Sequence, residues 1–177
     1  MPRVPINLPI RSPALWPLAL ALLCFLAFAG AATAEELRGR VVGIADGDTL
    51  TLLTDQREQV RIRLAEIDTP ERRQPYGDRA RQALAALAFG KVVRVEVVDI
   101  DRYGRTVGRI RETAVDVNAE LVRRGAAWVY RRYNRDLSLL QLEDEARAAR
   151  RGLWALPEAE RMPPWEWRAA ARSRAAR

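Results

Sequence analysis

The segment from Val60 to Glu71 joins a regular strand pattern to an abrupt break. Apolar residues alternate with basic or small ones at its start, in the order Val60, Arg61, Ile62, Arg63, Leu64 and Ala65. Because side chains on a strand alternate between two faces, this order predicts one apolar face and one face that carries guanidinium groups. Pro70 cannot donate a hydrogen bond to a sheet, and it favours an extended Thr69. We therefore expect the strand to end near Asp68 and to leave Asp68, Thr69 and Glu71 at the sheet edge.

The rest of the chain predicts an α+β fold that is mainly β. Alternating patterns predict further extended segments, at 37–45, 49–54, 93–97, 105–111 and, more briefly, 128–130. Helical patterns cover 78–89 and 137–150, and another helix begins at Asp116 or Val117 and ends at Gly125. Five strands with helices after the third and the fifth favour a small β-barrel capped by about three helices.

The chain contains no histidine, which excludes several catalytic classes. Hydrolases with Ser-His-Asp or Cys-His groups, histidine-dependent ribonucleases and His-ligated zinc sites all require imidazole. Any metal must therefore be held by oxygen, which favours Ca²⁺ or Mg²⁺.

The charge balance favours an anionic partner. The chain has 30 basic and 23 acidic residues, for a net charge of +7. Such an excess is typical of proteins that bind nucleic acid or a membrane surface. The alternative is a codon bias toward arginine, because Lys91 is the only lysine.

The first 34 residues are predicted to be a secretory signal peptide. An uncharged apolar run from Ala14 to Ala34 follows two arginines and ends in Ala-Thr-Ala. The run is also just long enough to span a bilayer, so an uncleaved membrane anchor is the alternative. Cleavage after Ala34 removes Cys24, the only cysteine, and leaves an exported domain, periplasmic or secreted, without disulfides. We expect no stable membrane association after cleavage.

Two carboxylates flank a glycine at Asp46-Gly47-Asp48, in a turn between two predicted strands, and Asp68 ends another strand. Neighbouring strands could bring these carboxylates to one point, where their repulsion would be costly. A divalent cation resolves that repulsion, since hard cations prefer oxygen ligands. The alternative is that Asp-Gly-Asp is simply a hairpin turn.

Two arginines lie near these carboxylates in the predicted fold. Arg63 is on the strand that leads to Asp68, and Arg105 follows a tight loop that contains Tyr103 and Gly104. Two guanidinium groups that face a metal can donate hydrogen bonds to the oxygens of a phosphate. The alternative is that both are solvated or paired with glutamates on the sheet surface.

With these acidic and arginine motifs combined, the chain resembles the staphylococcal nuclease (thermonuclease) family. The resemblance covers about 38–154 and rests on motifs in the family's order, namely Asp46-Gly47-Asp48-Thr49, Arg63-Leu64, Ile67-Asp68-Thr69-Pro70-Glu71, Tyr103-Gly104-Arg105 and Asn118-Ala119-Glu120-Leu121-Val122-Arg123-Arg124-Gly125. It implies a five-stranded OB-fold barrel and a calcium-dependent endonuclease that hydrolyses DNA and RNA with little sequence preference. It also implies that the bond to the 5′ oxygen breaks, which leaves 3′-phosphate ends.

The same resemblance implies a role for each site residue. Asp48 and Asp68 would be carboxylate ligands of one Ca²⁺ ion, the Thr69 carbonyl a third ligand, and Asp46 a further carboxylate near the ion. Glu71 would be the general base that takes a proton from the attacking water. Two arginines would neutralise charge that grows on the phosphate, namely Arg63 and Arg105.

Aromatic residues are expected to flank the bound nucleotide. We expect Tyr103 to bind nucleic acid, and the resemblance leaves open whether Tyr130 or Tyr133 stacks on a base or sugar. The alternative is that these last two aromatic residues are simply part of the core. The loop Arg72–Pro75 is shorter than the lysine-rich loop of the family's type member, so access to the site and metal affinity are open questions.

The predicted organisation is a signal peptide at 1–34, a nuclease domain at 35–156 and a tail rich in Pro, Trp and Arg at 157–177. We expect the tail's tryptophans to dock on the barrel and its Ala/Arg end to fray. We expect DNA and RNA as substrates, no protein partner, and a monomer. One alternative is an exported OB-fold module that binds nucleic acid without cleaving it, and another is a protein that binds anionic lipid through its arginines.

Overall fold

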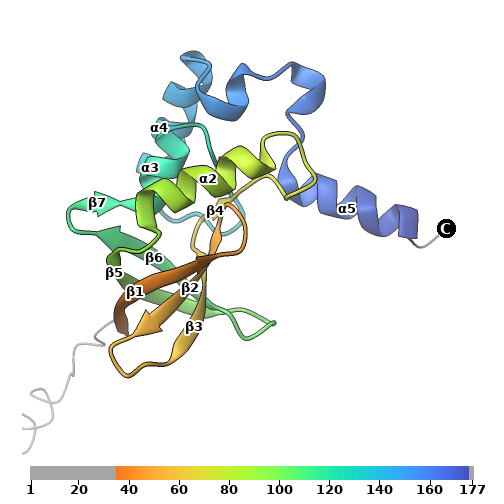
Figure 1. The fold of residues 1–177 in the computed structure, drawn as a ribbon. Helices are drawn as coiled ribbons and strands as arrows, with labels where there is room; N and C mark the ends of the chain where they lie inside the picture. Colours follow the sequence, from red (N-terminus) through yellow and green to blue (C-terminus); the bar gives the residue numbers. More distant parts are fainter. Residues whose placement is uncertain (1–34, 176–177) are drawn as a thin grey trace, which may run out of the picture. The chain divides into compact units, whose positions relative to one another are not determined.

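The computed structural model describes residues 35–175, so the predicted signal peptide lies outside the described residues. The strands are β1 (Glu36–Ile44), β2 (Thr49–Thr54), β3 (Gln59–Leu64), β4 (Ile67–Asp68), β5 (Val92–Ile100), β6 (Thr106–Glu112), β7 (Val115–Asp116) and β8 (Trp128–Val129) (Figure 1). The α-helices are α2 (Gly77–Ala88), α3 (Val117–Arg123), α4 (Leu137–Ala148) and α5 (Pro164–Ala175). Within 35–175, no helix has the length and apolar character that crossing a bilayer requires.

Five strands form a closed barrel, as the sequence predicts. Strands β3, β2, β1, β5 and β6 pair side by side as antiparallel neighbours, and a parallel pairing of β3 with β6 closes the ring. Both β1 and β5 carry an irregularity in their register, near Gly43 and Asp99. Such bulges increase the local bend of a strand, which helps a short sheet to curl into a barrel.

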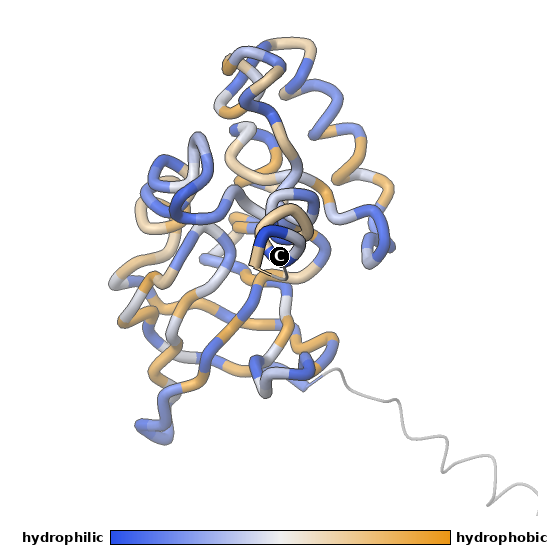
Figure 2. Tube along the Cα trace, turned by 90° about the vertical axis from the view of Figure 1, so that its right-hand side faces the viewer, coloured by the Kyte–Doolittle hydropathy of each residue, from blue (hydrophilic) through white to orange (hydrophobic). Residues whose placement is uncertain are grey.

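The alternation of β3 is as predicted. Ile62 and Leu64 are buried in the core, while Arg61 is exposed and Arg63 is half-buried on the opposite face. Figure 2 shows hydrophobic and hydrophilic segments alternating along the strands of the barrel. The guanidinium groups of β3 therefore lie outside the barrel core.

Three helices cover one end of the barrel (Figure 1). Helix α2 buries the spaced residues Ala80, Leu84 and Leu87, and the left-handed Gly90 (φ 76°) follows it. Helix α3 begins where the Asp116 side chain accepts a hydrogen bond from the backbone of Ala119. These helices and α4 contribute to a single core cluster with the barrel strands.

The expected single strand from Val60 to Asp68 is wrong. β3 ends at Leu64, the chain turns at Glu66 (φ 65°), and β4 then pairs with β8, with Asp68 opposite Trp128. The buried Asn118 stabilises this turn because its amide donates to the Ala65 carbonyl (2.9 Å). The turn moves Asp68 from the barrel sheet into a separate two-stranded ladder.

The C-terminal tail also differs from expectation. Its Ala/Arg end does not fray within the described residues, but forms α5, an additional helix beyond those that cap the barrel. The tail's tryptophans do dock in part, since Trp165 packs edge-on against Trp128 at a ring-centroid distance of 5.9 Å. Pro163 precedes the helix and Pro164 is its first residue, a position where proline is well tolerated.

Candidate active site

A cleft of about 1290 Å³ gathers side chains from distant parts of the chain. It includes most of the site residues predicted from the sequence, which are Asp46, Asp48, Arg63, Thr69, Glu71, Tyr103, Arg105, Tyr130 and Tyr133. Asp68 is fully buried just behind the lining. Helix α5 adds three further lining residues, Trp165, Arg168 and Arg172.

The turn that carries Asp46 and Asp48 packs closely against the segment after β4. A Cβ atom on Gly47 would lie 2.6 Å from the Thr69 hydroxyl, so a larger residue does not fit there. The Asp48 carboxylate accepts hydrogen bonds from the Thr69 backbone (3.4 Å) and from the Thr49 hydroxyl (3.0 Å). The small glycine is what lets the turn bring Asp48 to Thr69.

Arg63 bridges the two predicted ligand carboxylates. Its Nη2 atom lies 3.0 Å from Asp68 Oδ1 and 3.5 Å from Asp48 Oδ2. Burial alone would lower the pKa of Arg63, but Asp48 and Asp68 outweigh that effect and raise it. The structure thus brings Asp48 and Asp68 together around the guanidinium group of Arg63.

The pKa of Asp48 shows mainly what burying this carboxyl costs. Burial raises the pKa of Asp48 to about 8, the Arg63 charge opposes the rise, and the neighbouring Asp46 and Asp68 add to it. A further cation at this point would favour the ionised form of Asp48. The electrostatics therefore fit a site that takes up positive charge.

The donor chemistry fits an oxygen-ligated hard cation such as Ca²⁺. In the part of the chain from 35 to 175, no three acidic side chains converge tightly enough to hold an ion by themselves. Asp48 and Asp68 would therefore need the Thr69 carbonyl and water as further ligands, which is usual for this type of cation.

Arg105 lines the cleft but is not an unpaired clamp. Its Nε and Nη2 atoms lie 2.7 Å and 2.6 Å from Asp101 Oδ2. Asp101 also accepts the backbone N–H groups of Tyr103 and Arg105, which fixes the loop between β5 and β6. Burial would raise the pKa of Asp101, but the hydrogen bonds from Arg105 and Tyr103 lower it. The sequence pattern had assigned no role to Asp101.

The three tyrosines lie in different environments. Tyr103 is exposed, with the Arg102 and Arg105 guanidinium groups 4.8 Å and 5.6 Å from its ring centroid. Tyr130 is half-buried and stacks on Trp165, with ring centroids 5.2 Å apart and an interplanar angle of 7°. Tyr133 is exposed and meets Tyr130 edge-on. That these tyrosines contact a bound nucleotide stays a prediction.

Arg168, on α5, is the residue that the sequence reading missed. Its guanidinium group pairs with Asp68 and with Glu71. Burial would lower the pKa of Arg168, but its hydrogen bonds to Asp68 and Glu71 raise it further than burial lowers it. The available signal was the aromatic Trp-Glu-Trp-Arg sequence at 165–168, which is unusual for a plain linker.

Known proteins of similar sequence define the family. Residues 61–156 match the family described as Staphylococcal nuclease homologue. The chain is 48% identical over 161 residues to "Protein ParB" of Escherichia coli, which covers 85% of this chain and 89% of that protein. It is 42% identical over 149 residues to "Micrococcal nuclease" of Shigella flexneri, which covers 78% of this chain and 84% of that one.

A third relative carries the name "Uncharacterized endonuclease", from Escherichia coli O157:H7. It is 46% identical over 134 residues, which cover 75% of this chain and 86% of that protein. The barrel, the matched region and these relatives agree with the resemblance found from the motifs. The chain belongs to the staphylococcal nuclease homologue family.

Proposed function

We propose that this chain is a calcium-dependent nuclease that hydrolyses DNA and RNA with low sequence preference and leaves 3′-phosphate ends. Its family and its nuclease-named relatives support nuclease activity. The observation that carries the proposal is one cleft lined by Asp48, Glu71 and two arginines, with the buried Asp68 in contact with Arg63.

The metal would be held by Asp48, Asp68 and the carbonyl of Thr69, with Asp46 close by. When bound, the ion would neutralise negative charge on the phosphate. Asp46 supports the turn, since its carboxylate accepts the Asp48 backbone N–H at 3.1 Å.

Glu71 would accept the proton of the attacking water. Its Oε1 atom accepts a hydrogen bond from Arg168 (2.8 Å), and among residues 35–175 no partner contacts Oε2. Oε2 is thus the oxygen available to a water molecule. A carboxylate positioned in this way typically contributes a rate factor of about 10²–10⁴ as a general base.

The two arginines would donate to the phosphate with the atoms that their carboxylate partners leave free. Asp48 and Asp68 engage only Nη2 of Arg63, and Asp101 engages Nε and Nη2 of Arg105. Because each guanidinium is held on one side and both residues line the cleft, their remaining N–H groups would be available as fixed donors to a bound phosphate. Preorganised donors stabilise charge that develops in the transition state.

The test is a gel assay of cleavage on single-stranded DNA, duplex DNA and RNA, with Ca²⁺, Mg²⁺ or a chelator. We expect cleavage of all three substrates with Ca²⁺ and none with the chelator. The Glu71→Gln variant should bind nucleic acid and Ca²⁺ normally but lose cleavage, because an amide cannot accept the proton. Retention of nucleic acid without cleavage by the unaltered protein would instead support a binding module.

We also propose that the protein is exported, on the basis of the apolar run and its Ala-Thr-Ala ending. N-terminal sequencing of the protein from its host should begin near Glu35. Recovery of the full-length chain in the membrane fraction would support an uncleaved anchor instead.

A further inference from the structure

We propose that Arg168, supplied by helix α5, is a positioning residue that holds the Glu71 carboxylate for proton transfer. The inference rests on the proposed function, because it requires Glu71 to be the general base. It makes the C-terminal helix a part of the active site.

The first support is the geometry of the guanidinium group. Arg168 is bidentate on Asp68, with Nη1 3.1 Å from Oδ1 and Nη2 2.6 Å from Oδ2. The same Nη1 atom lies 2.8 Å from Oε1 of Glu71. Bidentate pairing of a guanidinium with a carboxylate fixes its orientation. Arg168 therefore links the base directly to the predicted metal ligand.

Asp68 is a rigid anchor for this link. Its side chain is fully buried, its backbone pairs with Trp128 in the β4–β8 ladder, and Arg63 holds it from the other side. Glu71, in contrast, lies after β4 on a half-buried turn, and its side chain is 37% exposed. A half-exposed glutamate side chain samples several rotamers unless a contact fixes it, and fixing it costs conformational entropy. The contact with Arg168 fixes the Glu71 side chain before substrate binds.

The second support is that the C-terminal segment docks at two further places. Gln74 accepts the Glu71 backbone N–H (3.1 Å), and its own amide donates to the Met162 carbonyl. Trp165 stacks on Tyr130, next to β8. The segment before Arg168 is thus tied both to the turn that carries Glu71 and to the strand that carries the partner of Asp68.

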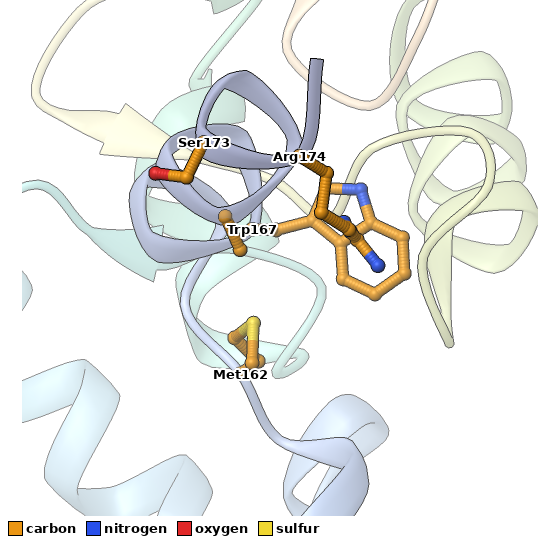
Figure 3. A pocket seen from close by; sticks show the side chains of 5 residues that line it. Met162, Trp167, Ser173 and Arg174 are labelled. Carbon is orange, nitrogen blue, oxygen red and sulfur yellow. The ribbon is translucent and has the colours of Figure 1, made fainter. Parts of the chain in front are cut away.

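Helix α5 presents a different face to a second hollow (Figure 3). That hollow is lined by Met162, Trp167, Ala170, Ser173 and Arg174. Trp165 and Arg168, in contrast, line the active-site cleft. Arg174 therefore offers a control on the same helix, away from the carboxylates.

The Asp68 carboxylate can accept hydrogen bonds from Arg168 and still offer a lone pair to a cation. An ionised carboxylate offers about four acceptor positions. Asp68 uses two on Oδ1, for Arg63 and Arg168, and one on Oδ2, for Arg168. Oδ2 keeps an acceptor position, and Arg168 makes no contact with Asp48 within the described chain. The opposite role, a lock that excludes the cation, is an outcome of the test.

The experiment compares Arg168→Ala, Arg168→Lys, Glu71→Gln and the Arg168→Ala/Glu71→Gln double variant, with Arg174→Ala as the control. Cleavage of a short single-stranded DNA gives kcat and KM, and calorimetry without substrate gives the Kd for Ca²⁺. We expect Arg168→Ala to lower kcat by about 10²-fold, the effect of a misplaced catalytic group. KM and the Kd for Ca²⁺ should stay within about threefold, and the lysine variant should recover part of the rate.

The double variant separates positioning from a structural effect. If Arg168 acts through Glu71, its loss should cost nothing further once Glu71 is Gln. An equal loss in both backgrounds would overturn the proposal, as would an unchanged rate in Arg168→Ala. Near-UV circular dichroism monitors the stacking of Trp165. If the alanine variant loses that signal, Arg168→Gln, which keeps most of the length, is judged by the same criteria.

Two outcomes identify what has failed. A higher rate and a tighter Kd for Ca²⁺ in Arg168→Ala would show that Arg168 is a lock, and would overturn positioning while leaving the nuclease intact. Full activity of Glu71→Gln would overturn the assignment of the general base, and the role of Arg168 with it. Arg174→Ala should cleave at the normal rate, and a comparable loss there would overturn a specific role for Arg168.

Discussion

Replacing Arg63 with alanine should destabilise the protein and slow cleavage, whereas replacing Arg61 should do neither. Both arginines lie on the outer face of β3. Arg63 contacts Asp48 and Asp68, whose side chains are 6% and 1% exposed. Arg61 is exposed and lies opposite Thr51, and its side chain makes no hydrogen bond or ion pair in the described part of the chain.

The expected loss in the free energy of unfolding depends on which carboxylate is left without a cationic partner when Arg63 is removed. Removing one member of a buried ion pair costs about 3–5 kcal/mol, because the remaining charge stays desolvated. Asp68 keeps Arg168 as a partner, whereas Asp48 keeps no cationic side chain in contact within 35–175. Asp48 can escape the full cost at pH 7 by taking up a proton, because its pKa is already raised to about 8 with Arg63 in place. We therefore expect a loss near the lower limit, about 3 kcal/mol. Arg61→Ala should cost less than about 0.5 kcal/mol, as is usual for an exposed position.

Urea unfolding at pH 7 with a chelator measures the free energies of unfolding. Ca²⁺ should recover part of the loss in Arg63→Ala, because it replaces the missing positive charge beside Asp48. In cleavage assays, Arg63→Ala should be about 10²–10⁴-fold slower, the range for removal of a preorganised donor. A loss below about 1 kcal/mol would refute the electrostatic reasoning. An inactive Arg61→Ala with an active Arg63→Ala would refute the assigned register of the site.

Three further variants test the site and its support. The Asp48→Asn variant should fold but bind Ca²⁺ more weakly, as measured by calorimetry, because it lacks one of the charges that the ion neutralises. An unchanged affinity would show that Asp48 is not a ligand. Glu143→Ala should cost about 1–3 kcal/mol in urea unfolding, because it leaves the buried Val129 backbone N–H without its acceptor, while the two arginines that pair with Glu143 are exposed to solvent. A loss below about 0.5 kcal/mol would contradict that role. Hydrogen bonds from Ser138 and Arg109 lower the pKa of Asp136 to about 2, below its unfolded value of 3.8. The stability that the Asp136 carboxylate contributes should therefore be present above pH 3.8 and be lost as pH falls through about 2. Asp136→Ala should lower the free energy of unfolding by about 1 kcal/mol at pH 7. A cost that persists at pH 2 would contradict this assignment.

The sequence alone determined the elements whose signals are local. The period of two in β3 and the spacing of buried residues in α2 follow from geometry within each segment, so both could be predicted. The cap at Asp116 and the left-handed Gly125 (φ 66°) likewise delimit α3 through neighbours in the chain. The order of the acidic and arginine motifs indicated the family for the same reason.

The tertiary structure decided what depends on contacts between distant residues. The turn after Leu64 that diverts Asp68 into β4 depends on the buried amide of Asn118, 53 positions away from Ala65.

The position of Arg168 is the clearest case. Its contact with Asp68 joins residues 100 positions apart, and nothing in the local pattern of either segment encodes it. It arises because the Met162 carbonyl accepts from Gln74 in the turn that carries Glu71 and Trp165 stacks on Tyr130, which places the next turn of α5 beside the carboxylates. Local periodicity specifies the helices and strands, but the free energy of a buried ion pair depends on which segments the fold brings together.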